Sequence, residues 1–550
     1  MKFRFQLFLF FCLGIVFAVS AQNATCYRIY LSDKNNTPYT VDDPSAYLSQ
    51  RAIDKRTRFN IPITEQDLPI NPQYKQQILD LHPQMQSLAV SKWMNTFTVY
   101  CPDSTVVPQI LNLPFVDSVW AVGNYVLHDV SVAQYPDNPV SMIHSIPTSS
   151  RESIDYGEGL SQIALFDGIP LHEEGFLGEG MLIVVIDGGF FGIETTSFYQ
   201  QLVNEGRFFG QYSLMPDFVD TLVSGSSTHG TIVTSTMAAN TNAELVGTAP
   251  AASYAFIQSE WVGSEELVEE DFWANGAEIA DSLGADVINS SLGYHNFPDF
   301  PQADVSYEDM DGQNSIASRC ATILGQKGVI VCAAAGNEGN NEYYHIGRPA
   351  DAFDILCVGA CAADSIIAYF SSRGPSYDGR VKPDIISMGV QTACYYPDDM
   401  FSFADGTSVA TPVAAGMCAC LWQAMPDYTA SEIMQMIRES GHLYDNPNPE
   451  YGYGIPDFYK VYTSHVGIND HNPLKIRVYP NPVTDKLHLT NLNGDIQSIS
   501  IYNAAGQLVL QTAVPNSPIL VIPVTNLPNG FYIGTVTLNN YQTATFKFVK

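Results

Sequence analysis

Ser408 is the residue of this 550-residue chain whose surroundings most favour chemistry. It follows Asp405-Gly-Thr and precedes Ala410–Gly416, a run of mostly small residues that predicts a closely packed helix. A serine hydroxyl is a weak nucleophile unless a base accepts its proton and a donor stabilises the oxyanion that forms. The positive end of a helix assists both steps. If Ser408 attacks a carbonyl, the chain must also hold a base, a carboxylate and an oxyanion donor.

Three other polar residues supply these groups. Asp187 ends the apolar run Met181–Ile186, which shows no alternation and therefore predicts a strand of parallel sheet that is buried on both faces. His229 is followed by glycine and an apolar helix, and Asn337 follows the apolar run Val329–Ala335. Open α/β sheets place their chemistry at the carboxyl ends of their strands. We predict that His229 is the base, Asp187 its carboxylate partner and Asn337 the oxyanion donor.

The order and local motifs of these residues resemble those of a known family. The order Asp187, His229, Ser408 is that of subtilisin and differs from the orders in chymotrypsin and the α/β-hydrolases. With Asp-Gly-Gly, His-Gly-Thr, Ala-Gly-Asn and Gly-Thr-Ser-Val-Ala-Thr-Pro, the chain resembles the subtilase family of serine peptidases over roughly residues 155–465. Further segments that resemble the family are Leu245–Ala251, Asp286–Gly293, Tyr369–Pro375 and Lys382–Ile385.

The chain departs from the usual family residues at several positions near these motifs. They are Gly188, Thr234, Ser235, Val409 and Ser387–Gly389. None of them is a group that transfers a proton in the family's mechanism. The departures therefore affect the expected substrate preference and rate rather than the expected reaction.

The resemblance implies an α/β fold, with a subtilisin-like parallel sheet flanked by helices, and hydrolysis of peptide bonds. It implies that an extended polypeptide substrate binds along Ser290, Ser291, Leu292 and Gly293, and that the first specificity pocket is lined by small residues, Ala334, Ala335 and Gly336. Small walls suit a sizeable P1 side chain. The alternative is a catalytically silent surface protein that uses the groove for binding or adhesion, which the presence of all four polar residues disfavours.

The N-terminus predicts export. Residues 1–21 place two basic residues before the apolar run Leu7–Val19, as in a secretory signal peptide that is cleaved after Ala21. A lipoprotein that uses Cys12 is disfavoured, because this cysteine lies inside the run and follows bulky Phe11. No other segment holds about 18 consecutive apolar residues, so we expect no membrane span.

The acidic charge of the chain is confined to its middle. Residues 136–474 carry 10 basic and 45 acidic residues, whereas 22–135 carry 8 and 10, and 475–550 carry 5 and 2. This partition predicts an N-terminal domain over 22–135, a peptidase domain over 136–465, a linker over 466–474 and a C-terminal domain over 475–550. The acidity argues against nucleic acid as a partner. The simplest interpretation is that the acidic charge keeps the protein soluble. The second is that it steers basic substrates toward the peptidase domain.

Residues 22–135 predict a small α+β domain. We predict strands at Cys26–Leu31 and Thr96–Cys101. We predict helical stretches at Pro44–Arg58 and Pro72–Leu81. The position resembles that of the N-terminal propeptide of subtilases, which acts as folding chaperone and temporary inhibitor. A chaperone suits a parallel sheet, because non-local strand pairing is slow to fold.

Two segments of this region could be sites of processing. The basic residues Arg51, Lys55, Arg56 and Arg58 are interpreted first as a solvated helix face and second as a cleavage site. The Pro- and Ser-containing segment Tyr135–Ser150 is the better candidate for a connector that is cut.

Residues 475–550 predict an all-β sandwich, because short strands alternate with Asn-Pro and Asn-Gly turns. Several segments resemble the sorting domain of the type IX secretion system. They are Tyr479–Pro482, Ala504–Gly506, Leu527–Tyr532 and the final Lys550. That resemblance implies a Gram-negative bacterium of the Bacteroidetes type, recognition by the secretion machinery, and a product that is secreted or held on the cell surface. An accessory Ig-like binding module is the alternative.

Cysteine and carboxylate clusters give weaker signals. Cys26 and Cys101 could pair, whereas the cysteines within apolar runs predict buried thiols: Cys332, Cys357, Cys418 and Cys420. Asp309–Gly312 matches part of a calcium loop but lacks the later ligands. The acidic residues at 265–271 are interpreted first as a solvated helix face and second as a lining of substrate subsites: Glu265, Glu266, Glu269, Glu270 and Asp271. We expect no required cofactor and no zinc site, and we keep structural calcium, frequent in subtilases, as an option.

Overall fold

The computed structural model describes residues 25–124, 154–215, 227–241, 243–260, 263–466, 477–490, 496–503, 505–512, 519–538 and 543–550. Its contacts divide the chain into two units, Met1–Tyr462 and Thr463–Lys550, which are described separately. The predicted signal peptide and the predicted connector Tyr135–Ser150 lie outside the described residues.

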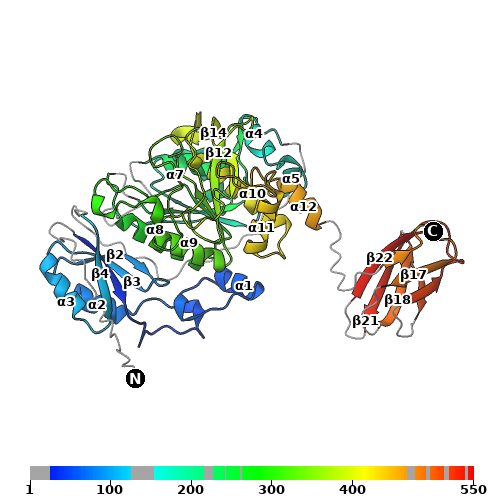
Figure 1. Cartoon of the computed structure of the whole chain (residues 1–550), viewed down its shortest axis with the longest axis horizontal. Coiled ribbons are helices and arrows are strands. Elements are labelled where there is room, and N and C mark those ends of the chain that lie inside the picture. Colours follow the sequence, from blue (N-terminus) through cyan, green and yellow to red (C-terminus); the bar gives the residue numbers. More distant parts are fainter. Residues whose placement is uncertain are drawn as a thin grey trace, which may run out of the picture. The chain divides into compact units, whose positions relative to one another are not determined.

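A seven-stranded sheet forms the centre of the first unit (Figure 1). Its order is β13-β12-β11-β10-β5-β9-β6, and each neighbouring pair is parallel. The strands are β5 (Leu182–Asp187), β6 (Phe208–Ser213), β9 (Ser253–Gln258), β10 (Val287–Ser290), β11 (Ile330–Ala334), β12 (Leu356–Cys361) and β13 (Ile385–Met388). The predicted parallel sheet is thus confirmed.

Helices cover both faces of this sheet, which explains the unbroken apolar run of β5. Leu182, Val184 and Ile186 pack with α8 (Val268–Leu283) and α9 (Ile316–Gln326). Ile183 and Val185 pack with helices on the opposite face, α7 (His229–Ala238), α10 (Thr407–Ala424) and α11 (Ala430–Ser440). All five side chains are fully buried, as a strand between two helical layers requires.

Shorter elements complete this domain. They are α4 (Leu160–Ala164), α5 (Ile169–Glu173), α6 (Ser197–Asn204), α12 (Phe458–Val466), the pair β7 (Asn240–Thr241) and β8 (Leu245–Val246), and the hairpin of β14 (Thr392–Tyr396) and β15 (Met400–Ala404). The hairpin leads directly into α10. Within the described ranges, no helix combines the length and the apolar character needed to cross a membrane.

The N-terminal domain is a four-stranded antiparallel sheet with three helices, which confirms the predicted α+β class. The sheet order is β2-β3-β1-β4. The elements are β1 (Cys26–Leu31), α1 (Gln50–Arg58), α2 (Pro72–Leu79), β2 (Gln86–Ser91), β3 (Thr96–Tyr100), α3 (Val107–Leu111) and β4 (Val116–Gly123). Its core is continuous with that of the peptidase domain, since Phe97 belongs to the same cluster as Phe272 and Trp273 of α8.

Charged residues join these two domains, and two interpretations made from the sequence are wrong for that reason. Arg56 of α1 is 1% exposed and donates to Asp281, so the basic cluster is not a solvated helix face. Glu266, Glu269, Glu270 and Asp271 are also buried. Asp271 accepts hydrogen bonds from Nε and Nη2 of Arg28 and from the Thr98 hydroxyl. Its side of α8 is therefore a docking face for the N-terminal domain rather than a solvated one.

The second unit contains two antiparallel sheets around one small core, as predicted for a sandwich. One sheet has the order β16-β17-β20 and the other β19-β18-β21-β22. The strands are β16 (Arg477–Tyr479), β17 (Lys486–Thr490), β18 (Ile496–Asn503), β19 (Leu508–Thr512), β20 (Ile519–Pro523), β21 (Phe531–Leu538) and β22 (Thr543–Val549). Leu487, Ile501 and Phe548 belong to the shared core.

The cysteines of the described residues are buried. Cys332, Cys357, Cys418 and Cys420 are thiols inside the peptidase domain, as predicted. Cys101 is a thiol as well, and its Sγ lies 3.5 Å from the carbonyl oxygen of Asp103. The pairing of Cys26 with Cys101 that the two strands suggested is therefore not formed.

Candidate active site

Asp187 and His229 meet at the carboxyl end of β5. The Nδ1 atom of His229, the first residue of α7, lies 2.8 and 3.0 Å from the two carboxylate oxygens of Asp187. Gly230 allows this approach, because a Cβ there would lie 2.6 Å from the carbonyl oxygen of Gly189. Since an ionised carboxylate only accepts, Nδ1 carries the hydrogen, and Nε2 is the nitrogen able to accept a proton.

The environment of the pair favours a charged imidazolium. Asp187 is fully buried and its Oδ1 also accepts from the Gly188 amide at 2.8 Å, whereas the His229 side chain is 37% exposed. Burial lowers the pKa of His229, but the charge of Asp187 and its hydrogen bond outweigh burial and hold that pKa above the usual value of 6.5. The pair can therefore take up a proton and keep it during a reaction.

Ser408 lies in the first turn of α10 and is held there through its carbonyl group. Its oxygen would normally accept from the amide four residues later, but that residue is Pro412, which has no N–H. Ser291 fills the gap, because its hydroxyl donates to the Ser408 carbonyl at 2.7 Å. The segment after β10 and the start of α10 are thereby fixed to one another.

Asn337 faces the same end of α10. Its Oδ1 accepts from the Thr407 amide at 2.9 Å and from the Thr407 hydroxyl at 3.0 Å, which leaves Nδ2 to point elsewhere. A Cβ on Gly406 would lie 2.9 Å from Ser408 Oγ, 3.6 Å from Ser408 N and 3.9 Å from Asn337 Nδ2. These three atoms therefore surround one small space, which Gly406, with φ +150°, leaves free. The Ser408 amide and Asn337 Nδ2 are therefore the candidate donors of an oxyanion hole.

The residues predicted to hold substrate lie at the carboxyl ends of the neighbouring strands β10 and β11, where Ser291 contacts Ser408 and Gly336 contacts Thr407. Ser290 is the last residue of β10 that pairs in the sheet, and Ser291, Leu292 and Gly293 continue beyond it. At the end of the neighbouring strand β11, Ala334 and Ala335 are buried, and Gly336 follows with φ +107°. A Cβ on Gly336 would lie 2.8 Å from Ser372 Oγ, so only glycine fits there. The Gly347 amide donates to the Ala335 carbonyl, which places a further glycine beside this wall.

Two residues of the site were not singled out in the sequence. Thr407 stood inside the serine motif, and only the structure shows that it holds the Asn337 amide. Glu260 follows β9 at the same sheet edge, and a Cβ on Gly188 would lie 3.2 Å from its Oε2. Burial above all, then Glu265 and Asp187, raise the pKa of Glu260 to about 8. A carboxylate just after a buried strand was the signal that could have identified Glu260.

The fragment that resembles a calcium loop does not fit a metal site. Asp309 Oδ2 accepts from the amide and hydroxyl of Ser306, and Asp311 accepts from Gln313 and Asn314. These carboxylates are already used to close turns. Over the part of the chain that the structure describes, no three or more His, Cys, Asp or Glu residues form a group that could hold a metal ion.

Comparisons with known proteins agree with this architecture. Residues 178–454 match the model of the subtilase family, 26–134 that of the peptidase S8 propeptide domain of Bacteroidota, and 477–550 that of a secretion system C-terminal sorting domain. Subtilisin E of Bacillus subtilis (strain 168) is 30% identical over 307 residues, which are 55% of this chain and 70% of that protein.

Two further relatives extend the comparison. Subtilisin of Bacillus pumilus is 30% identical over 307 residues, covering 55% of this chain and 97% of that protein. Serine protease AprX of Bacillus subtilis (strain 168) is 32% identical over 149 residues, covering 23% of this chain and 34% of that protein. The chain belongs to the subtilase family and is a subtilisin-like serine peptidase with an N-terminal propeptide domain and a C-terminal sorting domain.

Proposed function

We propose that this protein is an endopeptidase in which Asp187, His229 and Ser408 form the catalytic triad. His229 Nε2 accepts the hydroxyl proton as Ser408 attacks the peptide carbonyl, and Asp187 holds the imidazole in the required tautomer. The bond from His229 Nδ1 to Asp187, at 2.8 Å, is the observation that carries the proposal. The His229 imidazolium then protonates the leaving amine, and water hydrolyses the acyl-enzyme by the reverse sequence of proton transfers.

The oxyanion would be stabilised by Asn337 Nδ2 and the Ser408 backbone amide. Both atoms lie around the space beside Gly406, next to the nucleophilic oxygen. Loss of one such donor lowers kcat by about 10²–10³-fold, a figure from subtilisin. Protein groups alone supply these steps, so the proposed reaction needs no cofactor. Structural calcium stays a prediction, tested by comparing the melting temperature with and without a chelator.

We propose that substrate binds as an extended segment between Ser290–Gly293 and Ala334–Gly336. The first segment continues β10 past its paired residues, so its backbone can hydrogen-bond an added strand. Alanine and glycine form the second wall and leave room for a sizeable P1 side chain. This mode of binding recognises the substrate mainly through hydrogen bonds to its backbone rather than through one side chain. We therefore propose polypeptides as the substrate class.

We propose that the protein is exported through the type IX secretion system of a Gram-negative bacterium and acts outside the cell. The sorting domain at residues 477–550 supports this route. The predicted signal peptide, residues 1–21, would carry the chain across the inner membrane first. The secretion machinery is then the partner of the C-terminal unit.

Hydrolysis of an unfolded, fluorescently quenched polypeptide tests the proposal. Ser408→Ala is expected to abolish the signal, lowering kcat by about 10⁶-fold, as in subtilisin. Ser431→Ala is the matched control, since Ser431 is an exposed serine at the start of α11. Equal activity of the Ser408→Ala variant and the parent would refute the triad. No hydrolysis by any form, after the connector is cut, would instead favour a binding function of the groove.

A further inference from the structure

Glu260 is a partly buried carboxylate at the active-site end of the sheet, and the proposed mechanism does not use it. It lies two residues after β9, the strand that pairs with β5. The Ser259 amide donates to the Asp187 carbonyl at 3.1 Å, so the backbone before Glu260 is joined to the end of β5. The side chain of Glu260 therefore lies beside the pair of Asp187 and His229, and both act on its ionisation.

Gly188 leaves the space that the Glu260 carboxylate occupies. A Cβ on Gly188 would lie 3.2 Å from Glu260 Oε2 and 3.7 Å from Glu260 Cβ. The first contact is tighter than ordinary van der Waals contact, so a serine or threonine at this position would press on the carboxylate. Gly188 is also one of the positions at which the chain departs from the usual subtilase residues. The departure is therefore matched in space by an acidic side chain.

The groups around Glu260 do not balance its charge when it ionises. Within the described ranges, the groups that act most strongly on it are Glu265, Asp187, Tyr294 and His229, none of which is a lysine or an arginine. Burial above all, then Glu265 and Asp187, raise the pKa of Glu260, whereas the Tyr294 hydroxyl and His229 act in the opposite direction. A cation that reaches the ionised carboxylate therefore stabilises it.

The strand order of the sheet decides which substrate side chain reaches Glu260. A substrate that binds along Ser290–Gly293 extends from the end of β10, with β11 on one side and β5 and β9 on the other. Successive side chains of an extended segment point in opposite directions. If the P1 side chain, at the attacked carbonyl, enters the pocket at Ala334–Gly336 after β11, the preceding P2 side chain points toward the ends of β5 and β9. Asp187 and Glu260 lie there.

We infer that Glu260 selects a positively charged P2 residue, arginine or lysine, by pairing with it inside the substrate groove. The preferred substrates are then polypeptides with a basic residue immediately before the residue whose carbonyl is attacked. This inference rests on the proposed function, because the attack of Ser408 defines the P1 and P2 positions. The acidic charge of residues 136–474 would favour the approach of such substrates.

Two fluorogenic peptides that differ in one group test the inference. They are identical except for arginine or citrulline at P2, and citrulline keeps the shape of arginine without its charge. The value of kcat/KM is measured for each, and their ratio within one preparation cancels the amount of active enzyme. At pH 9 we expect the parent to prefer arginine about 10- to 100-fold, because a hydrogen bond between charged groups is formed in one complex only.

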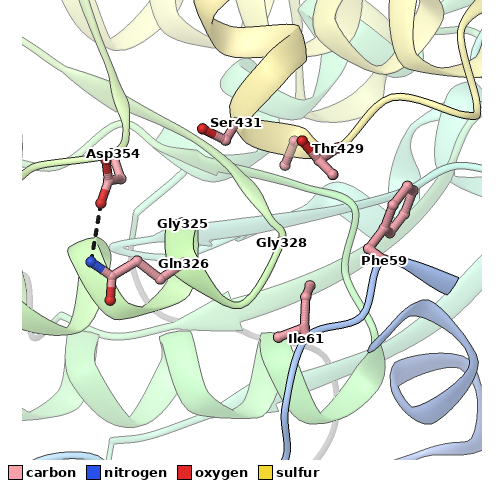
Figure 2. Close-up of a pocket in the computed structure, with 9 residues that line it drawn as sticks. Phe59, Ile61, Gly325, Gln326, Gly328, Asp354, Thr429 and Ser431 are labelled. Carbon is pink, nitrogen blue, oxygen red and sulfur yellow. Dashed lines mark hydrogen bonds between the residues drawn. The ribbon is translucent and has the colours of Figure 1, made fainter. Parts of the chain in front are cut away.

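Glu260→Gln should bring this ratio close to unity, because glutamine keeps the shape of Glu260 without its charge. Asp354→Asn is the matched control. Figure 2 shows Asp354 in a separate pocket, where it accepts from Gln326 Nε2 at 3.1 Å. It precedes β12, at the amino ends of the strands, and is exposed with φ +53°, which asparagine tolerates. This variant removes one acidic charge away from the groove and should keep the parent ratio.

The pH dependence of the ratio is a second measurement, and it needs no variant. Arginine stays charged, so the preference should rise as Glu260 ionises, up to its raised pKa of about 8, and level off above it. Protonated His229 cannot act as the base for either peptide, so its own titration cancels from the ratio. This measurement decides if Glu260→Gln hydrolyses neither peptide.

Three results would overturn the inference. They are equal kcat/KM values for the two peptides in the parent, an unchanged ratio in an active Glu260→Gln variant, and a ratio that stays constant from pH 6 to pH 9. In each of these cases the peptides are still cut, so the proposed function stands. No hydrolysis of either peptide by the parent would instead refute the proposed function and the inference with it.

Discussion

Thr407→Val is expected to lower kcat without changing the fold, because Thr407 orients the amide of Asn337. The parent structure holds Asn337 Oδ1 with two donors, the Thr407 amide at 2.9 Å and its hydroxyl at 3.0 Å. Valine keeps the first donor and removes the second. One neutral hydrogen bond contributes about 0.5–1.5 kcal/mol, so the expected loss is about 2- to 13-fold in kcat.

The comparison with Asn337→Ala sets the scale for this effect. Removal of the donor itself is expected to cost about 10²–10³-fold. Because Thr407 acts through Asn337, the double variant should be no slower than Asn337→Ala alone. Steady-state hydrolysis of a chromogenic peptide gives kcat and KM for each form. KM should change little, since the developing oxyanion is what Asn337 Nδ2 is placed to meet.

Thr411→Val provides a matched control one turn along α10. Its hydroxyl is buried and donates to the Thr407 carbonyl at 2.7 Å, away from Asn337. It should lose stability but keep kcat. Full additivity of Thr407→Val with Asn337→Ala, or an equal loss of kcat in Thr411→Val, would refute the positioning role of Thr407.

Three other variants test the surroundings of the triad. Asp187→Asn should lower kcat about 10⁴-fold. In the parent, the pKa that governs the acidic limb of kcat/KM should lie above 6.5, since Asp187 raises the pKa of His229; a pKa at or below 6.5 would contradict this. The pKa of Glu260 is raised to about 8, so its ionisation destabilises the folded state increasingly from the unfolded value of 4.5 up to pH 8. In a Ser408→Ala background, Glu260→Gln should therefore raise the melting temperature at pH 8 but not at pH 4. An equal rise at both pH values would contradict the raised pKa. Ser291→Ala should cost about 1–3 kcal/mol of unfolding free energy, because it leaves the Ser408 carbonyl without its donor, and urea titration measures that loss.

The sequence predicted the parallel sheet because its apolar runs have no alternation. Each run that was noted, before Asp187 and before Asn337, forms a strand between two helical layers. Glycines beside Asp187, His229 and Asn337 gave a second signal, since a Cβ on Gly230 would meet the Gly189 carbonyl oxygen and Gly336 has a φ of +107°. Such patterns can be interpreted from the sequence because each depends on residues within a single strand or turn.

Contacts between distant segments could not be predicted in the same way. The buried Arg56 and Asp281 lie 225 residues apart, and neither shows in the sequence that the other will neutralise it. Each charged cluster alone is typical of a solvated helix face, which is why both interpretations were wrong. The hydrogen bond from Ser291 to Ser408 could be predicted only in part. Pro412 shows in the sequence that the Ser408 carbonyl lacks its helical donor, but only the fold shows that Ser291 replaces it.

A fluorophosphonate probe tests the central claim most directly, because it forms a covalent bond only with a serine that is activated as a nucleophile. The chain without its predicted signal peptide, with the connector cut, is incubated with the probe, and mass spectrometry locates the adduct. The proposed triad predicts one adduct at Ser408, absent from Ser408→Ala and strongly slowed in His229→Ala. Unlabelled Ser408 in a folded protein, or labelling that does not depend on His229, would contradict it.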